Sequence, residues 1–348
     1  MKRNMIKLGD VATYINGYAF KPEDRGEVGL PIIRIQDLTG NAYDLGFYNG
    51  DYPKRIEIND GDVLISWSAS LGVYVWNRGR ALLNQHIFKV EFDKVNIDKS
   101  YFVYAVRQKL AEMAMKTHGA TMKHIVKKDF EETLIPYPSQ KKQIEIGTNL
   151  DKIANIIAAR KQQLELLDEL VKARFVELFG DAIYNDKGWE NDTVEKLCKE
   201  IYGGGTPSKS HPEYYEDGDI PWVSSKDMKT DVLTDSQIKI NQLGVDNSTA
   251  RMVPINSVIM VIRSGILKHT LPVAINAVPI TVNQDLKVFI PNKRVLTRFL
   301  AIQFKMHEKD ILSGVRAVTA DNIEFNSLKQ RELIVPPIEL QQEYVTFL

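Results

Sequence analysis

The chain has 348 residues, 44% of them hydrophobic and 26% charged, and its 45 Lys and Arg residues equal its 45 Asp and Glu residues in number. This is the composition of a globular protein, and the zero net charge excludes a uniformly basic surface but not local basic patches. Because Cys198 is the only cysteine, we expect neither disulfides nor a cysteine-rich zinc site. The N-terminus lacks an apolar signal region, and no apolar run approaches the roughly 18 residues of a membrane span, so we expect a cytoplasmic protein.

Residues 1–138 form the first predicted domain, in which hydrophobic strands alternate with polar turns. Leu30–Leu38 and Asp60–Ser66 each join a strand to a turn, and Asn84-Gln85-His86 precedes another apolar stretch. One helix is predicted from apolar residues at helical spacing, namely Phe102, Val106, Leu110 and Met113. The domain closes with a short strand and prolines at Leu134–Pro138.

Residues 139–180 predict one long helix with a coiled-coil seam. Ser139 can cap its start, Gly180 can end it, and Gln140 to Phe179 would span about 60 Å at roughly 1.5 Å per residue. Such a rod can hold two domains apart, and its seam requires a partner helix. Arg160 and Arg174 also lie on the seam, where they could fix the register or pair with an acid of the partner. We expect instead that their stems reach past the edge of the seam. The apolar seam positions are Ile146, Leu150, Ile153, Ile157, Leu164, Leu167, Val171 and Leu178.

Residues 181–338 repeat the plan of the first domain after a surface linker at 185–188. Ile201-Tyr202-Gly203 corresponds to Ile15-Asn16-Gly17, and Asn283-Gln284-Asp285 corresponds to Asn84-Gln85-His86. Residues 339–348 have the pattern of a second, truncated long helix. We therefore predict an α+β fold with two duplicated domains of mixed strands and helices, separated by a long coiled-coil-type helix.

Catalytic and metal-binding motifs are absent from the sequence. It contains no GxxxxGK[ST] phosphate loop, no HExxH and no GxSxG, and its six histidines do not cluster at metal-ligand spacing. Acidic pairs such as Glu131-Glu132 occur at the density expected of a charged surface. We therefore expect no catalytic and no metal-binding residues.

Both domains place polar side chains, several of them basic, on loops between strands, with aromatic residues nearby. Such side chains can hydrogen-bond base edges or phosphates, and loops on a rigid scaffold can present them to a DNA groove. Any one of them can equally be a solvated loop residue, but their recurrence at matching places favours DNA binding. The predicted DNA-binding residues are Trp67, Ser68, Ser70, Arg78, Arg80, His118, Thr121, Lys123 and His124 in the first domain, and Thr206, Ser208, Lys209, Ser224, Ser225, Lys226, Arg263, Ser264, Lys268, Arg316, Thr319 and Asn322 in the second.

Across essentially its whole length, the chain resembles the specificity subunit of type I restriction-modification systems. The resemblance is carried by the opening KLGDVATYINGYAF, by LIPYPSQKKQIEIGTNLDKI leading into a helix that ends ELVKARFVELFGD, and by a second domain that ends LIVPPIELQQEY. It implies two target-recognition domains, at 1–138 and 181–338, each reading one half of a split DNA site. The helix at 139–180 would act as a ruler and as a docking surface for methyltransferase subunits.

The resemblance also implies which chemistry belongs to other chains. Adenine methylation with S-adenosylmethionine, and ATP-driven, Mg-dependent cleavage, would be carried out by methyltransferase and restriction subunits, so no cofactor is assigned here. Family members normally carry a second helix that packs antiparallel on the first. Because that helix is not found, we expect the isolated chain to self-associate through residues 139–180 or to need methyltransferase subunits.

Two other functions are compatible with the sequence. A stand-alone DNA-binding regulator with duplicated domains would bind DNA tightly without a methyltransferase, and a protein-interaction scaffold would use the loops to hold peptides. The loops differ between the copies, as Arg34-Ile35-Gln36 against Ser224-Ser225-Lys226 shows, so we expect the two half-sites to differ as well.

Overall fold

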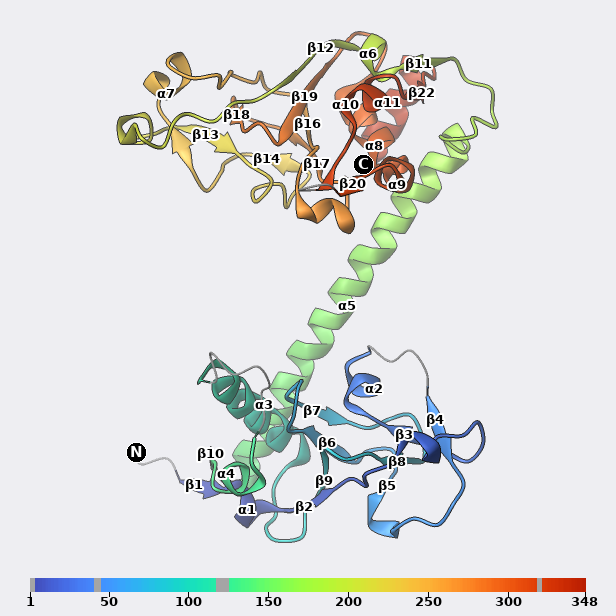
Figure 1. The fold of residues 1–348 in the computed structure, drawn as a ribbon, viewed down its shortest axis with the longest axis vertical. Coiled ribbons are helices and arrows are strands. Elements are labelled where there is room, and N and C mark those ends of the chain that lie inside the picture. Colours follow the sequence, from blue (N-terminus) through green and yellow to red (C-terminus); the bar gives the residue numbers. More distant parts are fainter. Residues whose placement is uncertain (1–3, 41–44, 117–124, 318–320) are drawn as a thin grey trace. The chain divides into compact units, whose positions relative to one another are not determined.

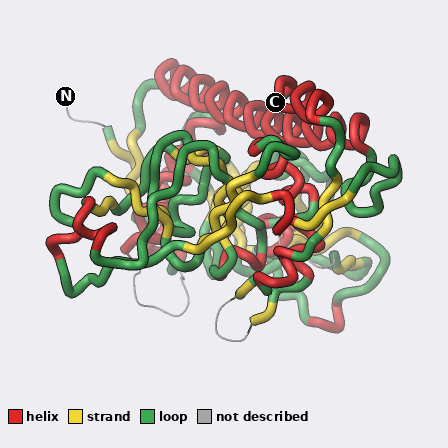
Figure 2. The backbone as a smooth tube through the Cα atoms, turned by 90° about the horizontal axis from the view of Figure 1, so that it is seen from above, coloured by secondary structure: helices red, strands yellow, loops and turns green. Residues whose placement is uncertain are grey.

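The computed structural model describes residues 4–40, 45–116, 125–317 and 321–348, and it divides into two compact units (Figure 1). Unit 1 comprises residues 1–162 and unit 2 comprises residues 163–348. Each unit mixes strands and helices, and helix α5 (Gln140–Phe179) has the bounds predicted for it, so the predicted fold class is confirmed. Figure 2 shows α5 as one unbroken helix. Within the described ranges, no helix is both long and apolar enough to span a bilayer.

Unit 1 contains two four-stranded sheets. The antiparallel sheet has the order β2-β9-β6-β7, and the mixed sheet has the order β4-β3-β8-β5, in which β3 and β8 pair in parallel. A two-stranded pair, β1-β10, joins the beginning and the end of the unit. The strands are β1 (Met5–Lys7), β2 (Thr13–Asn16), β3 (Leu30–Ile33), β4 (Gly46–Tyr48), β5 (Glu57–Ile58), β6 (Val63–Ser66), β7 (Gly72–Val75), β8 (Ala81–Leu83), β9 (Ile87–Glu91) and β10 (Leu134–Pro136).

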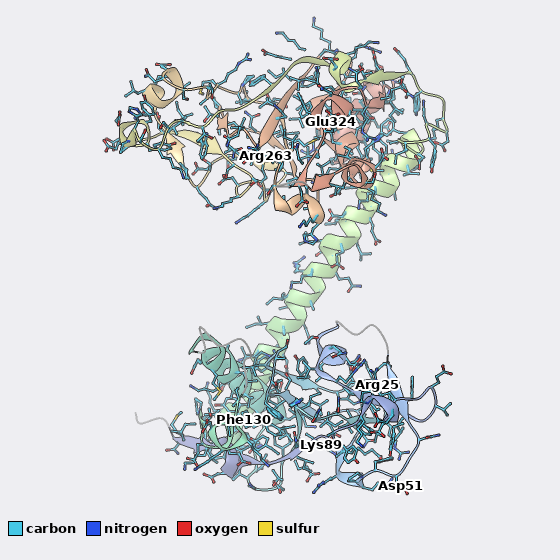
Figure 3. All side chains as sticks on the ribbon, in the orientation of Figure 1. Arg25, Asp51, Lys89, Phe130, Arg263 and Glu324 are labelled. Atoms are coloured by element: carbon cyan, nitrogen blue, oxygen red, sulfur yellow. The ribbon has the colours of Figure 1, made fainter. Side chains whose placement is uncertain are left out.

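Three of the helices of unit 1 pack on its antiparallel sheet, whereas the helix Ile35–Thr39 packs on the core under the mixed sheet. The main core includes Tyr14, Phe88, Phe102 and Phe130, and Figure 3 labels Phe130 within it. A second core, which includes Ile33, Leu64 and Leu82, lies under the mixed sheet. The helices are α1 (Leu8–Val11), α2 (Ile35–Thr39), α3 (Lys99–Lys116) and α4 (Lys127–Glu131), with short 3-10 turns at Pro22–Asp24 and Lys54–Ile56.

Unit 2 repeats this plan with a five-stranded sheet, β12-β19-β16-β17-β14, and a three-stranded sheet, β15-β13-β18. The pairs β11-β22 and β20-β21 complete it. The strands are β11 (Asn191–Thr193), β12 (Cys198–Gly203), β13 (Ile220–Val223), β14 (Val232–Leu233), β15 (Lys239–Ile240), β16 (Val258–Val261), β17 (Val273–Asn276), β18 (Thr281–Val282), β19 (Leu286–Pro291), β20 (Arg316–Ala317), β21 (Asp321–Asn322) and β22 (Glu332–Ile334). The helices are α6 (Val194–Leu197), α7 (Gln242–Asp246), α8 (Thr297–Met306), α9 (Glu308–Ser313), α10 (Phe325–Lys329) and α11 (Ile338–Phe347), with 3-10 turns at Pro212–Tyr214 and Gly265–Lys268.

Each end of α5 is anchored in its own unit. In unit 1, Asp151 accepts hydrogen bonds from the hydroxyl groups of Ser100, at 2.5 Å, and Tyr104, at 2.9 Å, both on α3. In unit 2, the fully buried Phe179 lies edge-on to Phe299 of α8, with 4.9 Å between ring centroids. These contacts leave the middle of α5 outside both cores.

The duplication extends to single hydrogen bonds. Asp37 accepts from the N–H of Arg34 at 2.8 Å, and Asp227 accepts from the N–H of Ser224 at the same distance. One detail of the sequence alignment is wrong: the strand registers match Asn16 with Gly203, one residue beyond the predicted match. The reason is a register shift in β12 between Cys198 and Glu200, which adds one residue to the second copy.

Candidate nucleic-acid interface

In unit 2, strand β16 ends at a turn that carries predicted recognition residues. The N–H of Ile262, directly after β16, donates to the carbonyl of Asp285 at 2.9 Å. Arg263 follows, and its Nε donates to Oδ1 of Asp285 at 2.6 Å. The Arg263 side chain is 48% exposed, and Figure 3 marks its position. The guanidinium is therefore held by a carboxylate at a surface where it can still reach a ligand.

The same turn gathers further predicted residues. Arg263 forms an isolated antiparallel bridge with Asn322 of β21. Ser264 caps the 3-10 turn Gly265–Lys268, and Nζ of Lys268 lies 3.8 Å from Oδ2 of the buried Asp321. We call Arg263, Ser264, Lys268, Asp321 and Asn322 the β16 edge cluster.

Thr206 lies beside this cluster, whereas the remaining predicted residues of unit 2 do not belong to it. The hydroxyl of Thr206 donates to Oε1 of Gln284, the residue before Asp285. Ser224 and Asp227 instead form a closed turn after β13 in the three-stranded sheet, where the serine hydroxyl donates to the carboxylate at 2.8 Å. Ser225 and Lys226 lie in that turn, and Ser208 and Lys209 follow β12, with the Ser208 hydroxyl 2.7 Å from that of Ser210.

The equivalent edge of unit 1 is aromatic. Trp67 follows β6, its ring stacks on Phe88 at 5.6 Å between centroids, and it contacts the His86 ring at 4.9 Å. Its Nε1 donates to Oδ1 of Asn16 at 3.3 Å. Ser68 is buried and Ser70 is exposed. Trp67 therefore fills a packing role at this edge, and Ser70 is the predicted residue here that faces solvent.

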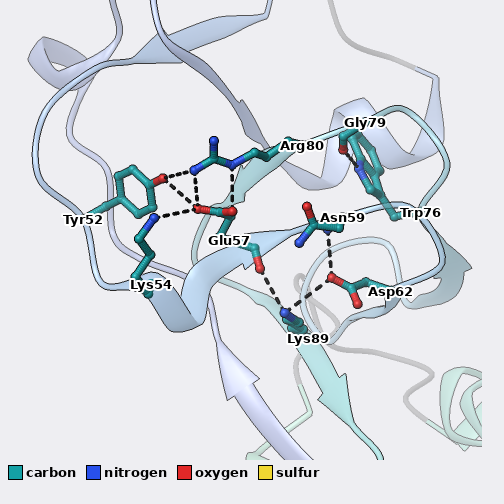
Figure 4. Close-up of polar contacts among 9 residues, drawn as sticks. All are labelled: Tyr52, Lys54, Glu57, Asn59, Asp62, Trp76, Gly79, Arg80 and Lys89. Carbon is teal, nitrogen blue, oxygen red and sulfur yellow. Dashed lines mark hydrogen bonds and ion pairs between the residues drawn. The ribbon is translucent and has the colours of Figure 1, made fainter.

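Arg78 and Arg80 lie between β7 and β8 and are both engaged within unit 1. Arg80 donates to Glu57 through Nε at 2.7 Å and through Nη2 at 2.9 Å, and Nη2 also donates to the Tyr52 hydroxyl (Figure 4). These hydrogen bonds from Arg80, and then that from Tyr52, lower the pKa of Glu57 to about 2. Arg78 lies over the Trp76 ring and donates to the Asp37 carbonyl at 2.8 Å.

Five predicted DNA-binding residues lie outside the described residues, namely His118, Thr121, Lys123, His124 and Thr319. The backbone of Arg316 forms part of β20, opposite Asn322 of β21. Their roles in DNA recognition remain predictions.

The seam of α5 is buried only near its two ends. Ile146, Leu150, Val171 and Leu178 are half-buried, whereas Ile153, Ile157, Leu164 and Leu167 are exposed. The expectation for Arg174 is wrong: its Nη2 donates to Oε1 of Glu343 on α11 at 2.7 Å and its Nη1 to Glu177 at 2.8 Å. The reason is that α11 packs beside the end of α5, where the Tyr344 hydroxyl donates to the Val171 carbonyl at 3.0 Å.

Each of these edges can offer hydrogen-bond donors to phosphate oxygens, and both donors and acceptors to the edges of bases. Their cations are compensated internally, because Arg80, Arg263 and Lys268 each face a carboxylate. The predicted DNA-binding residues include these cations but not the acids that pair with them. They also do not include Gln85 and Gln284, although both copies carry a glutamine at this equivalent place. No group of three or more His, Cys, Asp or Glu side chains within the described ranges is arranged to hold a metal ion.

Comparison with known proteins gives consistent matches. The sequence profile of the type I restriction modification DNA specificity domain matches residues 2–167 and again residues 186–348. The specificity subunit of the type I restriction enzyme EcoR124I/EcoR124II from Escherichia coli is 33% identical over 211 residues, which are 59% of this chain and 50% of that subunit. The MjaIX specificity subunit of Methanocaldococcus jannaschii is 23% identical over 368 residues, which cover 93% of this chain and 84% of the relative.

Solved structures share the fold. The type I restriction-modification S subunit from M. genitalium superposes with a TM-score of 0.65 at 12% identity, over 99% of this chain and 88% of that chain. A chain from a study of type I restriction-modification complex assembly has a TM-score of 0.50 at 15% identity, over 99% of this chain and 88% of that chain. This chain spans about half the length of the E. coli relative.

Proposed function

The chain belongs to the family defined by the type I restriction modification DNA specificity domain, and from that membership we propose that it is the DNA-recognition subunit of a type I restriction-modification complex. Each domain copy would read one half of a split double-stranded DNA site. The observation that carries this proposal is the duplication itself: residues 2–167 and 186–348 match the same domain, yet their exposed strand ends carry different side chains. A shared scaffold with different edges suits the recognition of two different half-sites.

The ion pairs at the candidate interface support a DNA-recognition subunit that acts within a larger assembly. DNA affinity depends strongly on the release of counterions by unpaired cations. Arg263 is paired with Asp285, and Arg80 is paired with Glu57. Each arginine must therefore exchange a carboxylate for a phosphate or a base edge, which reduces the free energy that it contributes to DNA binding. We therefore propose that the isolated chain binds DNA weakly and that basic partner subunits supply the remaining affinity.

Helix α5 is proposed to set the separation of the half-sites and to dock methyltransferase subunits. Its central face carries the exposed Ile153, Ile157, Leu164 and Leu167, and an apolar face of this kind marks a protein interaction surface. Methylation and cleavage, together with S-adenosylmethionine, ATP and Mg, are assigned to methyltransferase and restriction subunits. A cytoplasmic location, where such a complex meets DNA, is part of the proposal.

Single-molecule sequencing for methyladenine tests the proposal directly. Cells that express this chain with its cognate methyltransferase should show a split motif that is absent from cells expressing the methyltransferase alone. The motif would identify both half-sites at once. A methylation pattern that is the same with and without the chain would contradict the proposal.

A further inference from the structure

Each unit carries an Asn-Gln pair in the short connection between two strands of different sheets. Asn84-Gln85 joins β8 of the mixed sheet to β9 of the antiparallel sheet. Asn283-Gln284 joins β18 to β19 in the same way in unit 2. Because neither glutamine is among the predicted recognition residues, the role of this repeated pair is unassigned.

The backbone holds both connections in the same position. The N–H of Asn84 donates to the carbonyl of Ile33 at 3.0 Å, and the N–H of Asn283 donates to that of Val223 at 2.9 Å. These bonds continue the parallel pairing of β3 with β8 and of β13 with β18. The two connections are therefore equivalent in the sheets as well as in the sequence.

A glycine opposite each connection allows the close approach of two backbone segments. A Cβ atom on Gly17 would lie 1.9 Å from the carbonyl oxygen of Asn84, and one on Gly204 would lie 1.8 Å from that of Val282. No other residue fits without moving the backbone. Each connection is thus fixed in place, which preorganises any side chain that projects from it.

The two asparagines have a structural role that the glutamines lack. Oδ1 of Asn84 accepts from the N–H of Gln85 at 2.9 Å, and Oδ1 of Asn283 accepts from the N–H of Asp285 at 3.1 Å. Both glutamine side chains are instead exposed, and within the described part of the chain that of Gln85 has no hydrogen-bond partner. Gln284 accepts one bond from Thr206, so a second lone pair on Oε1 is still open.

Both glutamines lie next to the candidate interface. His86, directly after Gln85, contacts Trp67 at the end of β6. Asp285, directly after Gln284, binds Arg263 at the end of β16. The same carboxamide is therefore presented at the same place on two edges whose other side chains differ.

We propose that Gln85 and Gln284 are equivalent specificity-determining residues, each recognising an adenine at the same position of its own half-site. The carboxamide carries a donor and an acceptor, which match N7 and the N6 amino group of adenine in the major groove. Identical side chains on equivalent backbones would read the same type of base at the same position of each half-site. The neighbouring side chains, which differ between the units, would read the bases that distinguish the half-sites. The inference rests on the proposed function of the chain.

The test is methyladenine sequencing of cells that express the cognate methyltransferase with each variant chain. Gln85→Ala should relax adenine preference about 5- to 150-fold at one position of one half-site. Gln284→Ala should relax the equivalent position of the other half-site. Gln85→Glu should shift that position toward cytosine, because a carboxylate accepts from the N4 amino group.

Matched variants separate this role from a general effect of losing an exposed glutamine. Gln108→Ala on α3 and Gln242→Ala on α7 remove glutamines whose side chains donate along their own helices, to Glu112 and Asp246. Both should leave the motif unchanged.

The outcomes also separate this inference from the proposed function. A wild-type chain that yields no split motif overturns the proposed function and the inference together. A wild-type motif that neither Gln85→Ala nor Gln284→Ala alters overturns the inference alone. Uniform loss of methylation at every sequence, with no change of base preference, identifies a phosphate contact and also overturns it.

Discussion

Gln143 accepts a hydrogen bond from the backbone N–H of Asp98 at 2.9 Å, which ties the start of α5 to the segment that leads into α3. Nε2 of Gln143 also donates to the carbonyl of Pro138 at 2.8 Å. Gln341 repeats the device on α11, since it accepts from the N–H of Leu296 and donates to the carbonyl of Pro336, both at 2.9 Å. Both glutamines are almost completely buried, although of these four bonds only the one from Gln341 to Pro336 is fully buried and the other three are partly buried.

Gln143→Leu should destabilise unit 1 because it removes the partner of two partly buried groups, the N–H of Asp98 and the carbonyl of Pro138. A fully buried group left without a partner costs about 1–3 kcal/mol, so the loss for each of these two should lie toward the lower end of that range. Hydrogen exchange of the α3 amides measures it, and Gln140→Leu, at an exposed position of the same helical turn, is the control. Equal exchange rates in the Gln143 variant and the wild type would show that the bonds do not support the unit.

The buried glutamines illustrate what the sequence predicts and what it does not. The bounds of α5 follow from local signals, namely an apolar seam of period 3.5 that lies between Ser139 and Gly180, and the prediction of these bounds is confirmed. That the repeats LIPYPSQKKQ and LIVPPIELQQ each bury one glutamine depends on a loop about 45 residues away in the chain, which no local pattern reveals.

The same limit applies to the candidate interface. Exposed basic residues on loops between strands were predicted from their chemistry, and Arg263, Ser264 and Lys268 do gather at one edge. Their compensating acids were missed because pairing is non-local: Asp285 is 22 residues from Arg263, and Glu57 is 23 residues from Arg80. These ion pairs form because strand pairing brings distant parts of the sequence next to each other.

Phe179→Ala should release the end of α5 from unit 2. The Phe179 ring lies 4.9 Å from that of Phe299 and 5.5 Å from that of Tyr344, and it is fully buried. Removing a buried phenylalanine costs about 3–5 kcal/mol, so the last turns of α5 should exchange their amide hydrogens faster. Val176→Ala, on the exposed side of the same turns, should change stability by less than about 0.5 kcal/mol. Similar effects of the two variants would contradict this assignment.

Glutamates introduced on the exposed apolar face in the middle of α5 should abolish self-association of the chain and its binding to methyltransferase subunits. Ile157 and Leu164 are 52% and 63% exposed, so replacing both with glutamate should leave the fold intact. Sedimentation at micromolar concentration should show the wild-type chain self-associated and the double variant monomeric, and methyltransferase subunits should no longer bind the variant. The control for added negative charge is the double variant Ala159→Glu/Gln162→Glu, which places two glutamates at exposed positions on the opposite side of the helix. A monomeric wild-type chain whose double variant still binds methyltransferase would refute this role.

Arg263→Ala should change site preference rather than stability. Its ion pair with Asp285 is partly exposed, and such pairs contribute about 1 kcal/mol or less. Loss of a base contact should cost about 1–3 kcal/mol of discrimination at one position of the half-site read by unit 2. Methyladenine sequencing measures the change, and Lys305→Ala, which breaks the surface pair with Asp231, is the matched control. An unaltered motif would remove Arg263 from the recognition surface, and Lys123→Ala tests unit 1 in the same way.

Unit 2 should lose stability as the pH falls below about 6.5, the ordinary pKa of histidine. His307, between α8 and α9, is buried, and this burial, followed by the nearby Arg331, lowers its pKa in the folded state. Below pH 6.5 the unfolded chain therefore binds a proton that the folded chain does not, and the free energy of unfolding decreases until the lowered pKa is reached.

His307→Phe removes the titrating group and should flatten this pH dependence, whatever it does to the absolute stability. Hydrogen exchange of the α8 amides between pH 7 and pH 5, corrected for the intrinsic exchange rate, gives the slope. His211→Gln, which replaces an exposed histidine that lies 2.8 Å from Glu213, should leave the slope in place. An equal slope in the His307 variant and the wild type would mean that other groups cause the acid sensitivity of unit 2.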